Sequence, residues 1–368
     1  MSTKKWTFTR LGFLSVALAT AVAGLAAPIR HARTRDDDSR FLQTNLVSDV
    51  PGMALFTDPQ LVNPWGISHS PASPFWVSDN GTGVATLYNT AGTKQRLVVT
   101  IPPPAGDSGP SAPTGQVFNG SANFEVASGK PAFFIFATED GTISGWNPSV
   151  NLTRAILKVD NSASGAVYKG LAIGSVGTDM FLYAANFRDR RIDVFDKNYK
   201  PISAPGAFFD KHIKKGYAPF NITNLGGFLF VSYALQDEAK HDDVPGKGHG
   251  FVDVFDTSGN LLKRLIKHGR LNSPWGMTFA PASFGEVAGM LLVGNFGDGR
   301  ITAYEIEDDE AEENGQLRDV HEKPIVIDGL WALIVGNGKL GGDASKVYFT
   351  AGIDGEQHGL FGSIEIAP

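Results

Sequence analysis

The stretch MLLVGNFGDGRITAYE (290–305) decides the fold, because it joins an apolar strand, a Gly-rich turn and a second strand that ends in an aromatic residue. Short apolar runs on either side of Gly-Asp-Gly are typical of a β-hairpin. A single hairpin is at best marginally stable in water, so it needs further strands to pack against. The fold therefore depends on whether this pattern recurs.

The pattern occurs six times along the chain. The other copies are FWVSDNGTGVATLYN (75–89), FFIFATEDGTISGWN (133–147), MFLYAANFRDRRIDVFD (180–196), FLFVSYAL…GKGHGFVDVFD (228–256) and VYFTAG…GLFGSIEI (347–366). The aromatic residues that end the second strand follow one another at intervals of 49 to 60 residues, at Tyr88, Trp146, Phe195, Phe255 and Tyr304. This interval is the size of a four-stranded propeller blade with loops of variable length.

Each hairpin also has flanking apolar segments. We expect inner strands at 63–70, 122–127, 168–174, 218–225, 273–280 and 329–336, and fourth strands at 96–102, 154–160, 261–267 and 324–329. The sixth unit has only three strands, so FLQTNLVS (41–48) is predicted to supply the fourth, closing the ring and covering an exposed edge. The acidic stretch 308–319 permits a helix and is interpreted as a solvated insertion. The prediction is an all-β, six-bladed β-propeller of four-stranded antiparallel blades over 41–368, and the alternative is a two-domain β-sandwich.

The first forty residues have the pattern of an export signal. Lys4, Lys5 and Arg10 precede an apolar run at 11–25, and small residues follow it. We expect a signal peptide at 1–27, a flexible segment at 28–40, and a secreted or periplasmic protein with no transmembrane segment after cleavage. The alternative is an uncleaved anchor, for which fifteen apolar residues are short.

Composition excludes several classes of function. The 368 residues contain no Cys, which excludes disulfides, thiolate metal sites and a cysteine nucleophile. The net charge of −6 gives no electrostatic basis for binding nucleic acid. GxSxG and HExxH motifs do not occur either. We expect a monomer whose partners are not nucleic acids.

Blade geometry predicts where polar residues gather. In an antiparallel blade, the turn between the second and third strands lies on the same face as the start of the first strand, so all six turns surround one mouth of the central channel. The turn residues are Asp79, Asn80, Glu139, Asp140, Asn186, Asn295 and Asp298, together with 236–249, which includes His249, and 354–358, which includes Asp354 and His358. The inner strands add Asn63, Trp65, Tyr168, Lys169, Asn221, Trp275 and Trp331.

These residues suit a ligand site with polar groups and aromatic walls. Carboxylates and amides are ligands for Ca²⁺, and adding His249 or His358 would suit Zn²⁺ or Mn²⁺. His249 lies in a Gly-rich stretch that could form a lid over the channel. Two simpler interpretations stay open: Asp-Gly and Asn-Gly steps are ordinary turn residues, and the Trp residues of the repeated Pro-Trp-Gly could pack between blades.

Several segments resemble an uncharacterised family of secreted bacterial and fungal proteins. They are LQTNLVSDVPG (42–52), NPWGI (63–67), FATEDGTISGW (136–146), SPWGMTFAPASFG (273–285), LLVGNFGDGRI (291–301) and YFTAG…HGLFG (348–362). The resemblance covers about residues 41–366 and implies a six-bladed propeller without implying an activity. More distantly, the architecture is similar to NHL-repeat propellers and gluconolactonases. By that analogy, Glu139, Asn186, Asn295 and Asp354 are the candidate ligands of a divalent metal.

Three functions follow as hypotheses. The first is a binding module that holds a small molecule, glycan or peptide at the channel mouth, through Asp79, Asn80, Asp140, Asn221, His249, Asp298 and the three Trp residues. The second is a metal-dependent hydrolase or lactonase with His358 or Glu139 as the general base. The third is an extracellular scaffold that binds other proteins through its outer loops.

Overall fold

The computed structural model describes residues 39–203, 206–307 and 310–368. The predicted signal peptide at 1–27 and almost all of the predicted flexible segment at 28–40 lie outside these ranges. The described chain is built from β-strands and two single turns of 3₁₀ helix, η1 (Ser162–Ser164) and η2 (Gly285–Val287). No helix within these ranges has the length and apolar character needed to span a bilayer.

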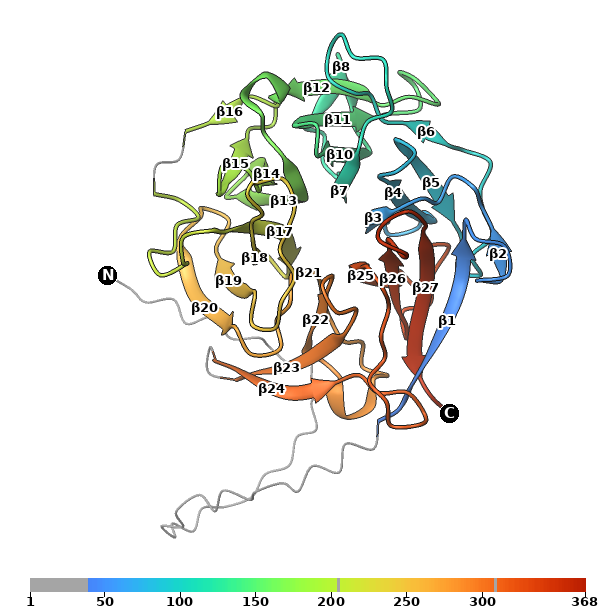
Figure 1. The fold of residues 1–368 in the computed structure, drawn as a ribbon. Coiled ribbons are helices and arrows are strands. Elements are labelled where there is room, and N and C mark those ends of the chain that lie inside the picture. Colours follow the sequence, from blue (N-terminus) through green and yellow to red (C-terminus); the bar gives the residue numbers. More distant parts are fainter. Residues whose placement is uncertain (1–38, 204–205, 308–309) are drawn as a thin grey trace, which may run out of the picture. The chain divides into compact units, whose positions relative to one another are not determined.

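Six antiparallel sheets form the blades of a propeller (Figure 1). The strands of each blade are given from the inner to the outer one. The first blade has β3 (Pro64–Ser68), β4 (Phe75–Asp79), β5 (Val84–Tyr88) and β6 (Val99–Thr100), and the second has β7 (Pro113–Phe118), β10 (Phe134–Thr138), β11 (Thr142–Trp146) and β12 (Ile156–Asp160). The third has β13 (Tyr168–Val176), β14 (Asp179–Asn186), β15 (Arg191–Phe195) and β16 (Pro201–Ile202), the fourth has β17 (Tyr217–Leu225), β18 (Phe228–Leu235), β19 (Phe251–Phe255) and β20 (Leu261–Lys267), and the fifth has β21 (Pro274–Phe279), β22 (Leu291–Asn295), β23 (Ile301–Glu307) and β24 (Glu310–Gln316). The predicted six-bladed β-propeller is confirmed.

The sixth blade closes the ring with strands from both ends of the described chain. Its inner strands are β25 (Leu330–Val335), β26 (Val347–Ala351) and β27 (Leu360–Ile366), and β1 (Phe41–Ser48) pairs antiparallel with β27 from Phe41↔Ile366 to Ser48↔Leu360. The short strand β2 (Phe56–Thr57) adds to β1 in parallel. The prediction that 41–48 supplies the missing outer strand is therefore confirmed.

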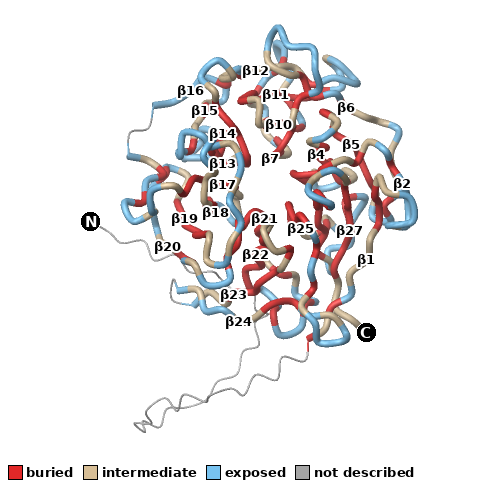
Figure 2. The backbone as a smooth tube through the Cα atoms, in the orientation of Figure 1, coloured by how far each residue is buried: buried red, intermediate tan, exposed pale blue. Residues whose placement is uncertain are grey.

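Glycines let neighbouring inner strands come close around the channel. A Cβ atom on Gly66 in β3 would lie 2.3 Å from the backbone oxygen of Thr114, and one on Gly115 in β7 would lie 2.3 Å from the backbone nitrogen of Leu171 in β13. Both distances are far below van der Waals contact, so these positions admit only glycine. Figure 2 shows the inner strands as largely buried segments around the centre of the ring.

Two strand predictions are wrong. The inner strand of the second blade is β7, whereas 122–127 contributes β8 (Glu125–Ala127), which pairs with β9 (Lys130–Pro131) in a separate two-stranded sheet. The outer strand of the fifth blade is β24, in the acidic stretch expected to be an insertion, and 324–329 forms no strand. An outer strand has a neighbour on one side only, so β24 can be almost wholly polar and still pair with β23.

Candidate functional site

A layer of aromatic side chains closes the centre of the ring. The rings of Trp65 and Trp331 stack at 3.5 Å between centroids, and Trp275 meets them edge-on at 6.2 and 5.9 Å. All three side chains are at most 4% exposed. Their role in this structure is packing between blades, and their faces are not available to a ligand at the mouth.

Lys169 lies on the mouth side of this layer. Its side chain is 1% exposed, and its Nζ atom lies 4.9 Å from the ring centroid of Trp65. The ammonium donates hydrogen bonds to Glu139 and, at 3.1 Å, to Asp242 Oδ1. Burial alone would lower the pKa of Lys169, but these two carboxylates outweigh burial, and the pKa is raised. Lys169 is therefore a permanent positive charge.

Two asparagines extend this network across the mouth. Asn80 donates to Glu139 Oε2 at 2.8 Å, and Asn63 donates to Glu356 Oε2 at 2.7 Å. The Asn63 amide also donates to Asn80 Oδ1 at 3.3 Å. A continuous network therefore runs from Glu356 to Asp242, and the turns and inner strands of five of the six blades contribute to it.

The carboxyl groups of this network ionise differently. Burial raises the pKa of Glu356, opposed by the hydrogen bond from Asn63. The pKa of Asp242 is lowered by its hydrogen bond with His241, whose Nδ1 lies 2.9 Å away, and by Lys169. Next to it, burial raises the pKa of Asp243 to about 6. The mouth therefore combines a fixed negative charge with carboxyl groups that hold their protons more tightly.

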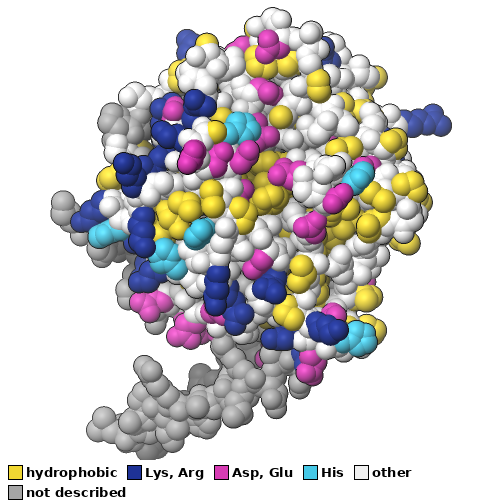
Figure 3. Space-filling view, in the orientation of Figure 1, with side chains coloured by type: hydrophobic (Ala, Val, Ile, Leu, Met, Phe, Trp, Pro, Cys, Tyr) yellow, Lys and Arg dark blue, Asp and Glu magenta, His cyan; other side chains and the backbone are white. Residues whose placement is uncertain are grey.

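The backbone is strained at the same place. Asn63, Asp354 and Glu356 have φ angles of 45°, 54° and 67°, in the left-handed region that side chains other than glycine rarely adopt. Such strain is typical of functional sites, where the surrounding structure holds it. Figure 3 shows acidic side chains gathered near the centre of the viewed face, next to hydrophobic ones.

We name this set the mouth network: Asn63, Asn80, Glu139, Lys169, His241, Asp242 and Glu356. Of the residues assigned a role from the sequence, it contains Asn80 and Glu139. Blade geometry also placed Asn63 and Lys169 at the mouth. His241, Asp242 and Glu356 lie in the turns 236–249 and 354–358, but no local signal in the sequence singled them out.

The other candidate ligand residues form hydrogen bonds within their own blades. Asp79 is fully buried and accepts a hydrogen bond from Thr86 at 2.7 Å, and Asp140 accepts one from the backbone of Ala112. Asn295 donates to Asp298 at 3.1 Å. These contacts match the simpler interpretation of such residues as turn-forming groups.

The remaining candidates form hydrogen bonds with residues outside the mouth network. Asn186 donates to Asp193, Asn221 donates to the Trp275 carbonyl, and the backbone nitrogen of Asp354 donates to Asp328. The Nδ1 atom of His249 lies 2.9 Å from the carbonyl of Val244.

His358 forms part of the ring closure. Its Nδ1 lies 2.7 Å from Asp49 Oδ2, just after β1, and Asp49 also accepts from the backbone of Gly359. The hydrogen bond to Asp49 raises the pKa of His358. His358 therefore bonds to the strand that closes the ring, and its role as a general base stays a prediction.

A metal ion fits the mouth network poorly. Glu139, His241 and Asp242 offer ligand atoms that lie within 4.8 Å of one another. However, the ammonium of Lys169 already bonds to Glu139 and Asp242, so it holds the position that a cation would need. Glu139 is the one member of the predicted metal set Glu139, Asn186, Asn295 and Asp354 that belongs to this cluster.

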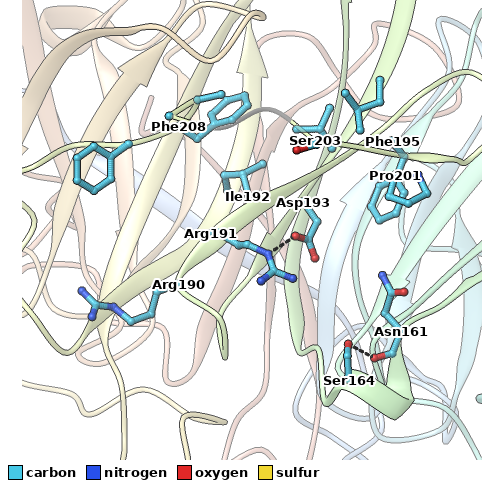
Figure 4. A pocket seen from close by; sticks show the side chains of 15 residues that line it. Asn161, Ser164, Arg190, Arg191, Ile192, Asp193, Phe195, Pro201, Ser203 and Phe208 are labelled. Atoms are coloured by element: carbon cyan, nitrogen blue, oxygen red, sulfur yellow. Dashed lines mark hydrogen bonds and ion pairs between the residues drawn. The ribbon is translucent and has the colours of Figure 1, made fainter.

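A cavity of about 580 Å³ lies elsewhere, on the outer strands of the third blade (Figure 4). Its charged side chains include Arg191 and Asp193, which form an ion pair with each other. It shares no residue with the mouth network. We place the candidate site at the mouth because polar and charged groups from five blades meet there.

Sequence comparison identifies viral relatives of this chain. No family model matches the chain. The chain is 34% identical to the uncharacterized protein R648 of Acanthamoeba polyphaga mimivirus over 329 residues, which are 87% of this chain and 78% of that protein. It is 35% identical to the uncharacterized protein L690 of the same virus over 330 residues, 87% and 84% of the two chains. The resemblance to secreted bacterial and fungal proteins therefore stays a prediction, since these relatives are viral.

Solved structures share only the fold. A Bacteroides thetaiotaomicron protein of unknown function has a TM-score of 0.52 at 10% identity and covers 89% of this chain and 77% of its own. The soluble aldose sugar dehydrogenase of Escherichia coli has a TM-score of 0.51 at 11% identity, with coverage of 89% and 100%. A streptogramin B lyase has a TM-score of 0.50 at 13% identity, with coverage of 89% and 98%.

Proposed function

This chain belongs to the family that contains the mimivirus proteins R648 and L690, and we propose that it is a binding module for a small polyhydroxylated ligand of the carbohydrate class, held at the channel mouth. The observation that carries the proposal is the mouth network, to which five blades contribute. Its carboxylates, amides and ammonium offer both acceptors and donors, which sugar hydroxyl groups require.

The chemistry of the mouth favours hydrogen bonding over stacking. Trp65, Trp275 and Trp331 lie beneath the network and are almost fully buried, so a ligand would meet polar atoms first. Charge-assisted hydrogen bonds to Asp242, whose side chain is 65% exposed, and to the half-buried Glu356 would give it both affinity and orientation. The proposal places the protein outside the cytoplasm, on the strength of the export pattern at 1–27.

A metal-dependent hydrolase is the second candidate. It is favoured by the convergence of Glu139, His241 and Asp242, and disfavoured by Lys169, which would have to withdraw before a cation could bind. If this candidate is correct, Lys169→Met raises the affinity for Ca²⁺, Mn²⁺ or Zn²⁺. A protein scaffold stays a prediction, without a particular feature that favours it.

Binding measurements separate these functions. The full chain is titrated calorimetrically with a panel of mono- and disaccharides, and separately with each metal ion. Glu356→Gln and Asp242→Asn should each weaken sugar binding about 10- to 100-fold, the cost of one charged hydrogen bond. The control is Glu238→Gln, an exposed carboxylate in the same loop as Asp242, which should bind as the wild type does. Sugar binding that survives both mouth variants, or no sugar binding at all, refutes the proposal.

A further inference from the structure

The central channel contains a second cavity, on the other side of the aromatic layer. It has a volume of about 360 Å³, and all six inner strands line it. Along β3 its lining begins at Gly66, directly after Trp65, and along β25 it begins at Ala332, directly after Trp331. The cavity therefore opens toward the face opposite the mouth network, and Trp65 and Trp331 separate the two.

The lining of this cavity carries no Asp, Glu, Lys or Arg. It is mainly apolar, and its members include Ile67, Val117, Leu171, Ile173, Ile222, Met277, Leu333 and Ile334. His69 is its one titratable residue, and both ring nitrogens lie within hydrogen-bonding distance of backbone carbonyls. A charged ligand would lose hydration here without meeting a carboxylate, ammonium or guanidinium group, so the lining favours uncharged ligands.

The buried polar side chains in the lining are Ser68, Gln116, Asn221 and Thr278, and Gln116 gives the cavity a direction. Gln116 projects from β7 and is 6% exposed. Its amide nitrogen donates at 2.9 Å to the carbonyls of both Gly66 and Trp76, so its donors are used within the protein. Its Oε1 atom accepts from the Ser68 hydroxyl at 3.3 Å, a long bond that leaves a lone pair free. The cavity thus offers an acceptor among apolar walls.

We infer that this cavity is a second ligand site, specific for one small uncharged molecule with an apolar body and a single hydroxyl group. Its volume is at the small end of the range for small-molecule pockets, and its apolar surface with few polar groups is typical of them. The hydroxyl would donate to Gln116, and the body would replace water against the aliphatic walls. This site is independent of the function proposed for the mouth.

The test uses a series of straight-chain primary alcohols from butanol to decanol. Trp275 lines the cavity, so its fluorescence reports binding to the full chain. Affinity should rise about fourfold for each added methylene group and level off once the cavity is full. The alkane of equal length should bind more weakly than the alcohol, because it has no donor for Gln116.

Blocking variants locate the binding. Thr223→Phe fills the cavity from a partly exposed position on β17 and should abolish alcohol binding, whereas Leu340→Phe on the exposed surface should not change it. If Thr223→Phe does not fold, as judged by its thermal transition, Ile173→Phe on β13 serves the same purpose. Failure of the wild type to bind any alcohol, affinity independent of chain length, or binding that a folded blocking variant retains overturns the inference.

Discussion

Replacing Lys169 by Met tests whether the mouth network is a buried ion pair. Met keeps the length and apolar stem of the side chain but removes the charge. Glu139, whose side chain is 12% exposed, then keeps a negative charge with only the Asn80 amide to offset it. Removing one partner of a buried ion pair typically costs about 3–5 kcal/mol. Asp242 adds little to this cost, because its side chain is 65% exposed and water screens it.

The assay is urea unfolding at neutral pH, for the wild type, Lys169→Met, Glu139→Gln and the double variant. The double variant should recover most of the loss, because an apolar side chain beside a neutral amide leaves no buried charge. The coupling free energy between the two positions should therefore exceed about 2 kcal/mol. The slope of free energy against urea should stay constant, which shows that the denatured state is unchanged.

Two results would refute this reasoning. One is a loss below about 1 kcal/mol for Lys169→Met, since that is the range of a solvated surface pair. The other is a double variant that is no more stable than Lys169→Met alone. Asp242→Asn provides the matched control and should cost less than about 1 kcal/mol.

Three further perturbations test the ring. Phe41 is 2% exposed and packs on Phe284, so Phe41→Ala should lower the free energy of urea unfolding by about 3–5 kcal/mol. Leu42→Ala, at a side chain that is 44% exposed on the same strand, should change it by less than about 0.5 kcal/mol, and equal costs would contradict the closure of the ring by β1. Gly115→Ala should destabilise the folded protein by at least about 1–3 kcal/mol, because the added Cβ would meet the backbone of Leu171. Gly109→Ala, whose added Cβ would have no atom within 4 Å, should leave the stability unchanged, and a stable Gly115→Ala protein would argue against the close approach of β7 and β13. Asp49 raises the pKa of His358 above 6.5, so the ion pair stabilises the fold below pH 6.5, and this stabilisation is lost as the pH rises through the raised pKa. The difference in unfolding free energy between the wild type and His358→Gln should therefore shrink over that pH interval, and a constant difference would exclude the linkage.

The hairpins could be predicted from the sequence because each contains its own signal. The apolar strand and its turn are adjacent in the chain, and both faces of the strand are buried, as in β22, so most of its residues are apolar. Strands that exist only because they pair with a neighbouring strand carry no such signal and were not predicted. β24 reads EAEENGQ, and only its pairing with β23 makes it a strand. In the second blade, the inner strand PTGQVF carries less apolar character than the sequence that follows it, so the apolar pattern points to 122–127 as the inner strand instead.

The sequence predicts that polar residues gather at the channel mouth, but it does not predict which residues form the mouth network. Blade geometry brings turns to the mouth, and this alone places Asn80 and Glu139 there. Which side chain within a turn faces the channel depends on local backbone angles, such as the positive φ of Glu356, and composition does not encode them. Asp79 shows the difference, since it is adjacent to Asn80 in the chain and yet points into its own blade, where Thr86 binds it.

The pairing of β1 with β27 also has a consequence for biosynthesis. Phe41 and Ile366 are partners in one sheet, so the contact that completes the ring joins residues from the two ends of the described fold. During translation the preceding blades leave the ribosome first and must wait until β27 is made, and until then the edge of β1 that pairs with β27 has no partner. The entropic cost of joining distant segments grows only slowly with their separation, so this long wait costs time more than stability. This exposed edge of β1 is then the part of the nascent chain that a chaperone would need to shield.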